Sequence, residues 1–134
     1  MIRAYKKGDE LKLKPNKFSD VSSVDDIFDN DNYIKHTLDD NGEIKCIMCW
    51  YNHAPDRYAI FFLMPDGVEF KHARALKRFL DEMTERLKPK SCVTYSFDCD
   101  MLNRWHEFFG FQKRDGDGVL IDNKKFNKWE ILWA

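Results

Sequence analysis

The feature that most constrains the fold of this chain is a fully apolar segment followed by a long amphipathic one. Residues 57–64 are apolar on both faces of an extended chain, which predicts a central strand in a sheet that is covered on both sides. After a Pro-Asp-Gly break at 65–67, apolar residues recur at three- and four-residue steps over 68–87. This period predicts a helix that ends before Pro89, and a buried strand leading into a helix favours an α/β arrangement.

Turn signals divide the rest of the chain into short strands and one further long helix. Asn41-Gly42 between two β-prone runs is a strong hairpin signal. No repeat or long linker interrupts residues 1–134, so we expect one domain of the α/β (α+β) class, with a largely antiparallel sheet and a parallel step at each helix crossover. The other expected elements are strands over 2–6, 33–38, 43–52, 91–97, 111–114, 119–121 and 126–133, helical segments over 10–14 and after Ser23, and a helix capped by Asp98 or Asp100 that ends at Gly110.

Charge and hydropathy argue against several functional classes. The 134 residues carry 22 Lys and Arg against 23 Asp and Glu, whereas proteins that mainly bind nucleic acid need an excess of cations to displace counterions from phosphates. The first residues contain no apolar run of signal-peptide length, and no stretch approaches the roughly 20 apolar residues of a membrane-spanning helix. We therefore expect a cytoplasmic, soluble protein without a membrane partner, for which nucleic acid is not the expected ligand.

Two patterns that could suggest a metal have simpler explanations. Cys46 and Cys49 form a C-x-x-C pair, but on a predicted strand residues three apart point to opposite faces and cannot share one ion. The Asp-Gly-Asp-Gly run at 115–118 lacks calcium ligands at the later positions of an EF-hand loop, where Val119 and Phe126 stand. We expect reduced thiols, a plain turn and no metal.

The order of elements and one local motif resemble the GNAT superfamily of N-acetyltransferases. The segment Trp-His-Glu-Phe-Phe-Gly-Phe at 105–111 is similar to the Phe-Tyr-x-x-x-Gly-Phe segment at the end of the last helix in that family. The resemblance in topology covers nearly the whole chain. It implies a mixed, mainly antiparallel sheet of six to seven strands flanked by helices. It also implies transfer of an acetyl or acyl group from coenzyme A, as acetyl-CoA, to an amine of a small molecule or a protein.

The resemblance also implies catalytic residues. The family's tyrosine in this segment often protonates the departing coenzyme A thiolate, and His106 stands at that position. An imidazole can serve as acid or base near neutral pH, and its step from Trp105 predicts that it points away from the buried face. His53 and Asp56 lie in a turn beside the predicted central strand, near where acetyltransferases often keep a base, although turn formation alone also explains Asp56.

The expected coenzyme site is the start of the long helix. The family signature there is Arg/Gln-x-x-Gly-x-Gly/Ala, and Val68, Lys71 and Ala73 fall on its three defining positions, of which only Ala73 fits. The helix dipole and nearby cations can still attract an anion, while main-chain groups of the preceding strand align the pantetheine arm. The donor-binding residues expected from the resemblance are therefore Leu63, Met64, Val68, Lys71, His72, Ala73 and Arg74.

Two other functions compete with the enzyme. The poor match to the phosphate-binding signature suggests a catalytically inactive GNAT-like structural or host-interacting protein. Small bacteriophage-encoded GNAT-like proteins, including virion components, resemble this chain in size, and such a protein would sit in the virion and contact other phage or host proteins. A nucleic-acid-associated factor would use Lys71, Arg74 and Arg78, which share one helix face, but we interpret these charges as a solvated face.

Overall fold

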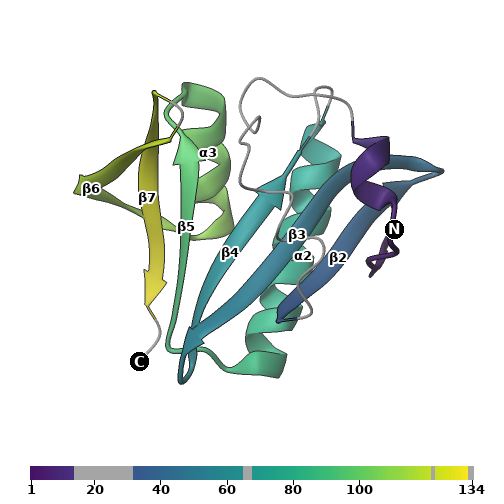
Figure 1. Ribbon diagram of the computed structural model, residues 1–134, viewed down its shortest axis with the longest axis horizontal. Helices are drawn as coiled ribbons and strands as arrows, with labels where there is room; N and C mark the ends of the chain where they lie inside the picture. Colours follow the sequence, from purple (N-terminus) through teal and green to yellow (C-terminus); the bar gives the residue numbers. More distant parts are fainter. Residues whose placement is uncertain (14–31, 65–67, 122, 133–134) are drawn as a thin grey trace.

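The described part of the chain folds around one sheet of seven strands with two long helices (Figure 1). The structure is a computed structural model, and it describes residues 1–13, 32–64, 68–121 and 123–132. The predicted short helix after Ser23 lies outside these residues. The described elements are β1 Ile2–Ala4, η1 Asp9–Lys12, β2 Tyr33–Asp40, β3 Glu43–Ala54, β4 Arg57–Leu63, α2 Phe70–Leu87, β5 Ser91–Phe97, α3 Asp100–Phe109, β6 Gln112–Ile121 and β7 Lys124–Leu132.

The sheet has the strand order β1-β2-β3-β4-β5-β7-β6. Each neighbouring pair is antiparallel except β4 and β5, which are parallel because α2 carries the chain between them. The predicted mixed, mainly antiparallel sheet of six to seven strands flanked by helices is therefore confirmed. The hairpin between β2 and β3 turns at Asn41 and Gly42, both with positive φ, as the Asn-Gly signal predicts.

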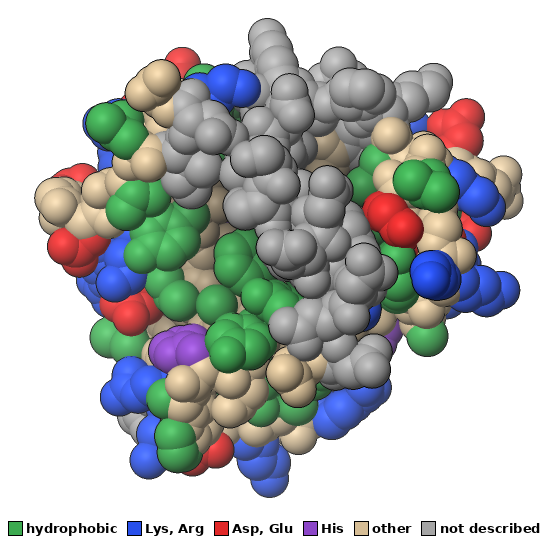
Figure 2. Space-filling model, in the orientation of Figure 1, with side chains coloured by type: hydrophobic (Ala, Val, Ile, Leu, Met, Phe, Trp, Pro, Cys, Tyr) green, Lys and Arg blue, Asp and Glu red, His purple; other side chains and the backbone are tan. Residues whose placement is uncertain are grey.

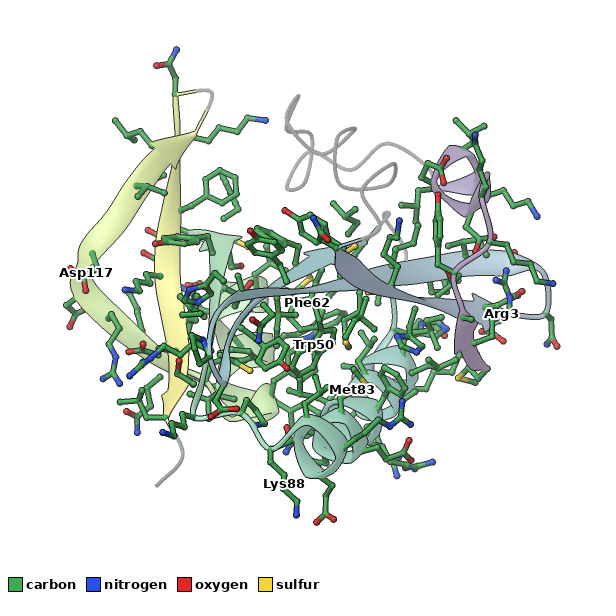
Figure 3. All side chains as sticks on the ribbon, turned by 60° about the horizontal axis from the view of Figure 1, so that its bottom comes forward. Arg3, Trp50, Phe62, Met83, Lys88 and Asp117 are labelled. Carbon is green, nitrogen blue, oxygen red and sulfur yellow. The ribbon has the colours of Figure 1, made fainter. Side chains whose placement is uncertain are left out.

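Both long helices pack on the same face of the sheet, and apolar residues fill the layer between them and the strands. Figure 3 shows Trp50 of β3 and Phe62 of β4 on the side of the sheet that faces Met83 of α2. A second, smaller core cluster lies on the opposite face, where apolar side chains gather over the middle of the sheet (Figure 2). Cys46 belongs to the first cluster and Cys49 to the second, which confirms that the two thiols point to opposite faces.

The helix α2 follows the predicted period. Its residues Ala73, Leu76, Leu80 and Met83 are buried against the sheet at steps of three and four. The helix ends where Lys88 adopts a left-handed conformation with φ of 46°, directly before the proline that cannot continue it. It begins two residues later than the apolar period alone suggests. None of the helices in the described part of the chain is long and apolar enough to cross a membrane.

The predicted cap of α3 is wrong. The N-cap residue is Cys99, and Asp100 is the first helical residue. The Asp98 carboxylate instead accepts hydrogen bonds from Asn103 at 3.2 Å and from the buried Asn127 of β7 at 2.9 Å. Two amide donors, one of them from a distant strand, therefore hold the carboxylate that sequence reasoning placed at a helix cap.

The C-terminal strands also differ from the sequence prediction. The segments expected as two short strands around a turn form one strand, β6, whose register against β7 shifts between Arg114 and Val119. The glycine-rich run 115–118 is thus an insertion within a strand, because β7 offers hydrogen-bond partners on both sides of it.

A charged network ties the start of the chain to the sheet. Asp9 is 3% exposed, and its two carboxylate oxygens accept hydrogen bonds from the Arg3 guanidinium at 2.9 and 3.0 Å. The Lys6 backbone N–H and the Thr37 hydroxyl of β2 also donate to it. The Arg3 hydrogen bonds hold the pKa of this carboxyl well below its usual range. The ionised form of Asp9 is therefore part of the folded structure.

Replacement of Asp9 by Asn should destabilise the protein by about 2 kcal/mol, because buried hydrogen bonds to a charged group are lost and the bidentate contact is broken. Urea denaturation of Asp9→Asn against wild type measures the change. Asp81→Asn is the matched control, since Asp81 forms only an exposed pair with Lys77 at 2.7 Å, and its effect should stay within about 0.5 kcal/mol. Equal effects of the two substitutions would contradict a structural role for the Asp9 network.

Candidate functional site

The most distinctive feature of the sheet is an opening between its two parallel strands. β4 and β5 pair at Arg57–Ala59 with Ser91–Val93, and beyond these residues the ribbons diverge (Figure 1). Past this point β4 stays paired with β3, and β5 with β7. Two strand edges with backbone N–H and C=O groups that do not pair with each other therefore face one another at the carboxyl ends of parallel strands, a common location for ligands in α/β proteins.

The start of α2 lies at the same end of β4 and is fixed there by His72. This side chain is 1% exposed, and its Nδ1 accepts the Glu69 backbone N–H at 2.9 Å. Because Nδ1 accepts, the proton is on Nε2, which donates to the Asp40 carboxylate at 2.9 Å. His72, which the resemblance assigned to the donor site, is thus used to fasten the helix start to the end of β2, and its side chain does not face solvent.

The cations near the helix start are partly neutralised. The Lys71 side chain is 60% exposed, and its ammonium lies 3.4 Å from the Asp40 carboxylate and 3.5 Å from that of Glu69. The hydrogen bond that the ammonium donates to the Asp40 carboxylate raises the pKa of Lys71, so the ammonium stays charged. Arg74, one turn further, is exposed. An anion at this helix start would therefore meet two cations, one of which must exchange its carboxylate partners for the anion.

The remaining expected donor residues contribute backbone and packing. Leu63 and Met64 are both buried, and they belong to the clusters on opposite faces of the sheet. Ala73 is completely buried and Val68 packs against the core below α2. Leu63, Met64 and Ala73 are thus placed to meet a ligand mainly through their main chain, which is the role the resemblance implied for the end of β4. The half-buried Val68 keeps part of its side chain at the surface.

The predicted orientation of His106 is wrong. The side chain is 4% exposed, and it lies more deeply than Trp105, which is half-buried. The apolar stripe of α3 is wide enough to include both residues, because a step of 100° around a helix need not leave a stripe of that width. The imidazole stacks on Trp129 of β7 at 5.4 Å and meets Phe62 of β4 edge-on at 6.0 Å. It therefore reaches both strands that flank β5.

Burial determines the chemistry of this histidine. Nδ1 lies 2.7 Å from the Leu102 carbonyl oxygen, which can only accept, so Nδ1 carries the proton and Nε2 is an acceptor. Burial lowers the pKa of His106 to about 4. At neutral pH the ring is therefore uncharged, its only proton is engaged, and it is better suited to accept a hydrogen bond than to protonate a thiolate.

His53 and Asp56 lie at the other end of β4, in the hairpin with β3, and both are exposed. The Asp56 carbonyl accepts the backbone N–H groups of Lys90 at 2.6 Å and Ser91 at 3.4 Å, so this residue helps to hold the paired ends of β4 and β5 together. The strand between Asp56 and the start of α2 spans about 20 Å. The structure thus does not bring the hairpin residues together with His106 or Lys71.

One residue that sequence reasoning did not single out stands beside His106. Trp129 is 1% exposed. Within the described part of the chain its Nε1–H has no hydrogen-bond partner, and among the buried side-chain polar atoms there only His36 Nδ1 shares this state. A tryptophan between polar residues of a predicted strand does indicate an inward-facing position. Its unpartnered N–H depends on what surrounds the ring, so no local signal could have found it.

Comparisons with known proteins show the fold but not a family membership. No family model and no curated protein matches the chain. A chimera of the spermidine N-acetyltransferase SpeG from Vibrio cholerae and hSSAT superimposes with a TM-score of 0.73 at 12% identity, covering 98% of this chain and 94% of the other. The dodecameric spermidine N-acetyltransferase from Vibrio cholerae gives 0.70 at 13% identity, covering 98% and 92%. A probable acetyltransferase gives 0.60 at 15% identity, covering 83% and 70%. The chain therefore has the GNAT fold.

The buried imidazole makes folding stability depend on pH. The pKa of His106 is about 4 in the folded protein and about 6.5 when unfolded, so the unfolded chain binds more protons between these values. Stability should thus fall as pH decreases from 6.5 towards 4. By linkage this histidine accounts for about 2 kcal/mol of the difference in unfolding free energy between pH 7 and pH 4.5. Urea denaturation of wild type and His106→Phe at both pH values measures it.

The control for this measurement is Phe109→Leu, a change in the same apolar cluster without a titratable group. It should lower stability but retain the wild-type pH dependence. His106→Phe should retain only the part due to other groups, including His36, whose pKa burial also lowers. If His106→Phe keeps the wild-type pH dependence, the pKa of His106 does not differ between the folded and the unfolded protein, and the prediction is contradicted.

Proposed function

We propose that this protein is an N-acyltransferase that moves an acyl group from acyl-CoA to an amine. The observation that carries the proposal is the divergence of β4 and β5 directly beside the start of α2. The GNAT fold, shared with solved acetyltransferases, supports it. A long donor with phosphates at one end and an amide-bearing arm at the other matches two strand edges that do not pair with each other and lie next to a helix N-terminus.

The residues present fit the arm of such a donor better than its phosphates. The facing edges of β4 and β5 offer main-chain groups to amides, as strand pairing would. At the helix start, Lys71 and Arg74 supply positive charge and the helix dipole adds to it. The carboxylates of Asp40 and Glu69 oppose this charge, so phosphate binding there costs the ion pairs of Lys71.

The reaction requires the amine nitrogen to attack the thioester carbon, with formation of a C–N bond and loss of the C–S bond. The amine loses a proton and the thiolate gains one. In this chain the neutral His106 is proposed to accept a hydrogen bond near the reacting groups through Nε2, instead of acting as the acid for the thiolate. A base role for His53 or Asp56 would require the amine to lose its proton at the hairpin end of β4, before it reaches the thioester, because this end lies about 20 Å along the strand from the start of α2.

The second candidate is a GNAT-fold protein without catalysis, with a structural or host-interacting role. One observation favours it: the start of α2 is engaged by Asp40 and Glu69 rather than left open to an anion. The two candidates differ in one measurable property, the binding of acyl-CoA.

Acetyl-CoA should bind and raise the thermal midpoint of the protein. At a ligand concentration of 100 times Kd the stabilisation is about 2.7 kcal/mol, which corresponds to several degrees for a domain of this size. Isothermal calorimetry and thermal melting with millimolar acetyl-CoA measure it. Absence of both heat and a midpoint shift would leave the non-catalytic candidate. Turnover is then assayed with a panel of amines that begins with spermidine, the substrate named for the structural neighbours.

The charges at the helix start should tune this affinity in opposite directions. Lys71→Ala should weaken acetyl-CoA binding about threefold to tenfold, since an exposed cation facing a phosphate is lost. Glu69→Gln should tighten it about twofold to fivefold, because a competing carboxylate is removed. Lys77→Ala is the control with the same change in net charge, at a residue paired with Asp81 further along α2. If Lys71→Ala and Glu69→Gln both bind like wild type, the phosphates are not at this helix start.

A further inference from the structure

The indole N–H of Trp129 is a buried donor without an acceptor among the described residues. Its side chain is 1% exposed, and within this part of the chain Nε1 has no hydrogen-bond partner. Leaving such a group unpaired costs folding free energy, and the great majority of buried polar atoms in proteins are paired, with protein or with ordered water. The N–H is therefore a candidate contact for a bound molecule.

The register of the sheet places this donor at the point where the sheet opens. Trp129 lies opposite Thr94 of β5. Thr94 directly follows Val93, which is the last residue of β5 that pairs with β4, through Ala59. The ring also stacks on His106, at 5.4 Å between centroids and 27° between planes, and His106 in turn meets Phe62 of β4. Trp129 is thus linked through one imidazole to the strand on the far side of the opening.

The surroundings of the indole restrict the chemistry of its partner. An indole N–H can only donate, so the partner must be an acceptor. The rings near His106 and Trp129 are those of Phe62, Phe109 and Phe111, and burial keeps the imidazole itself uncharged. An anionic acceptor such as phosphate or carboxylate would lose its hydration here without a counter-charge. A neutral carbonyl oxygen meets the requirement.

We propose that Trp129 Nε1–H donates a hydrogen bond to a carbonyl oxygen of the acyl donor, and that Trp129 is therefore a donor-binding residue of this protein. The inference rests on the proposed acyltransferase function. An acyl-CoA carries two kinds of neutral carbonyl, that of the thioester and those of the amides in its arm. Both kinds share the chemistry that the indole selects, and free coenzyme A, which lacks the thioester, distinguishes them.

The test is acetyl-CoA binding to wild type and to Trp129→Phe, followed by calorimetry with free coenzyme A. We expect the affinity for acetyl-CoA to fall about tenfold, as for loss of one buried hydrogen bond. If the partner is the thioester carbonyl, the affinity for coenzyme A should not change, and if it is an amide carbonyl, both affinities should fall. In a ¹H–¹⁵N spectrum, the wild-type indole signal of Trp129, assigned by its loss in Trp129→Phe, should move downfield when acetyl-CoA is added.

Two controls separate the lost N–H from lost volume. Trp50→Phe removes a similar volume from a completely buried tryptophan whose Nε1 already contacts Met48 Sδ at 2.9 Å, and it should lower stability without changing the affinity for acetyl-CoA. Replacement of Trp129 by 3-benzothienylalanine keeps the bicyclic shape and removes only the N–H. It should reproduce the loss of affinity while leaving the urea midpoint of the free protein unchanged.

Each outcome decides between the alternatives. If wild type binds acetyl-CoA and the benzothienyl variant binds equally well, the role of Trp129 is refuted and the acyltransferase proposal stands. If that variant loses stability but not affinity, the indole holds a structural water instead of a ligand, and the inference is again refuted. If wild type binds neither acetyl-CoA nor coenzyme A, the proposed function fails, and the role of Trp129 fails with it.

Discussion

The short parallel pairing of β4 with β5 is the constraint on which the rest of the structure depends. Three residue pairs hold the strands together, and then each strand follows its antiparallel neighbour in a different direction. Because sheets twist, two strand pairs that share only a short ladder separate readily. This separation divides the sheet into two halves, leaves two facing strand edges that do not pair with each other, and places the end of β4 beside the start of α2.

The polar groups around this opening are arranged by contacts between distant segments. His72 and Asp40 are 32 positions apart in the chain, yet their hydrogen bond fixes the start of α2 against the end of β2. His106 gains its low pKa from burial among aromatic rings, which come from β4, from β7 and from Phe111 between α3 and β6. The result is a helix start that is partly neutralised and an imidazole that is uncharged, and both differ from what the side chains alone suggest.

The sequence predicted the elements well where one periodic signal dominates. The strand after Arg57, the helix up to Leu87 and the strand over 91–97 lie where expected. It failed where two local signals compete or where the partner is remote. Asp98 is a good capping residue, but its carboxylate accepts hydrogen bonds from side-chain amides of α3 and β7 instead of capping the helix. The glycine-rich run at 115–118 resembles a turn, but β7 pairs with the chain on both sides of it.

The sequence by itself determined the fold class, the single buried strand that leads into α2, and the opposite orientation of the two thiols on β3, because hydrophobic periodicity is a local property that burial enforces. Only the tertiary structure decided how far β4 and β5 stay paired, that His106 points inward, and that the Trp129 N–H meets no acceptor among the described residues. These properties depend on which groups of distant strands and helices meet at one point, and hydrogen bonding and desolvation at that point are not encoded by neighbours in the sequence.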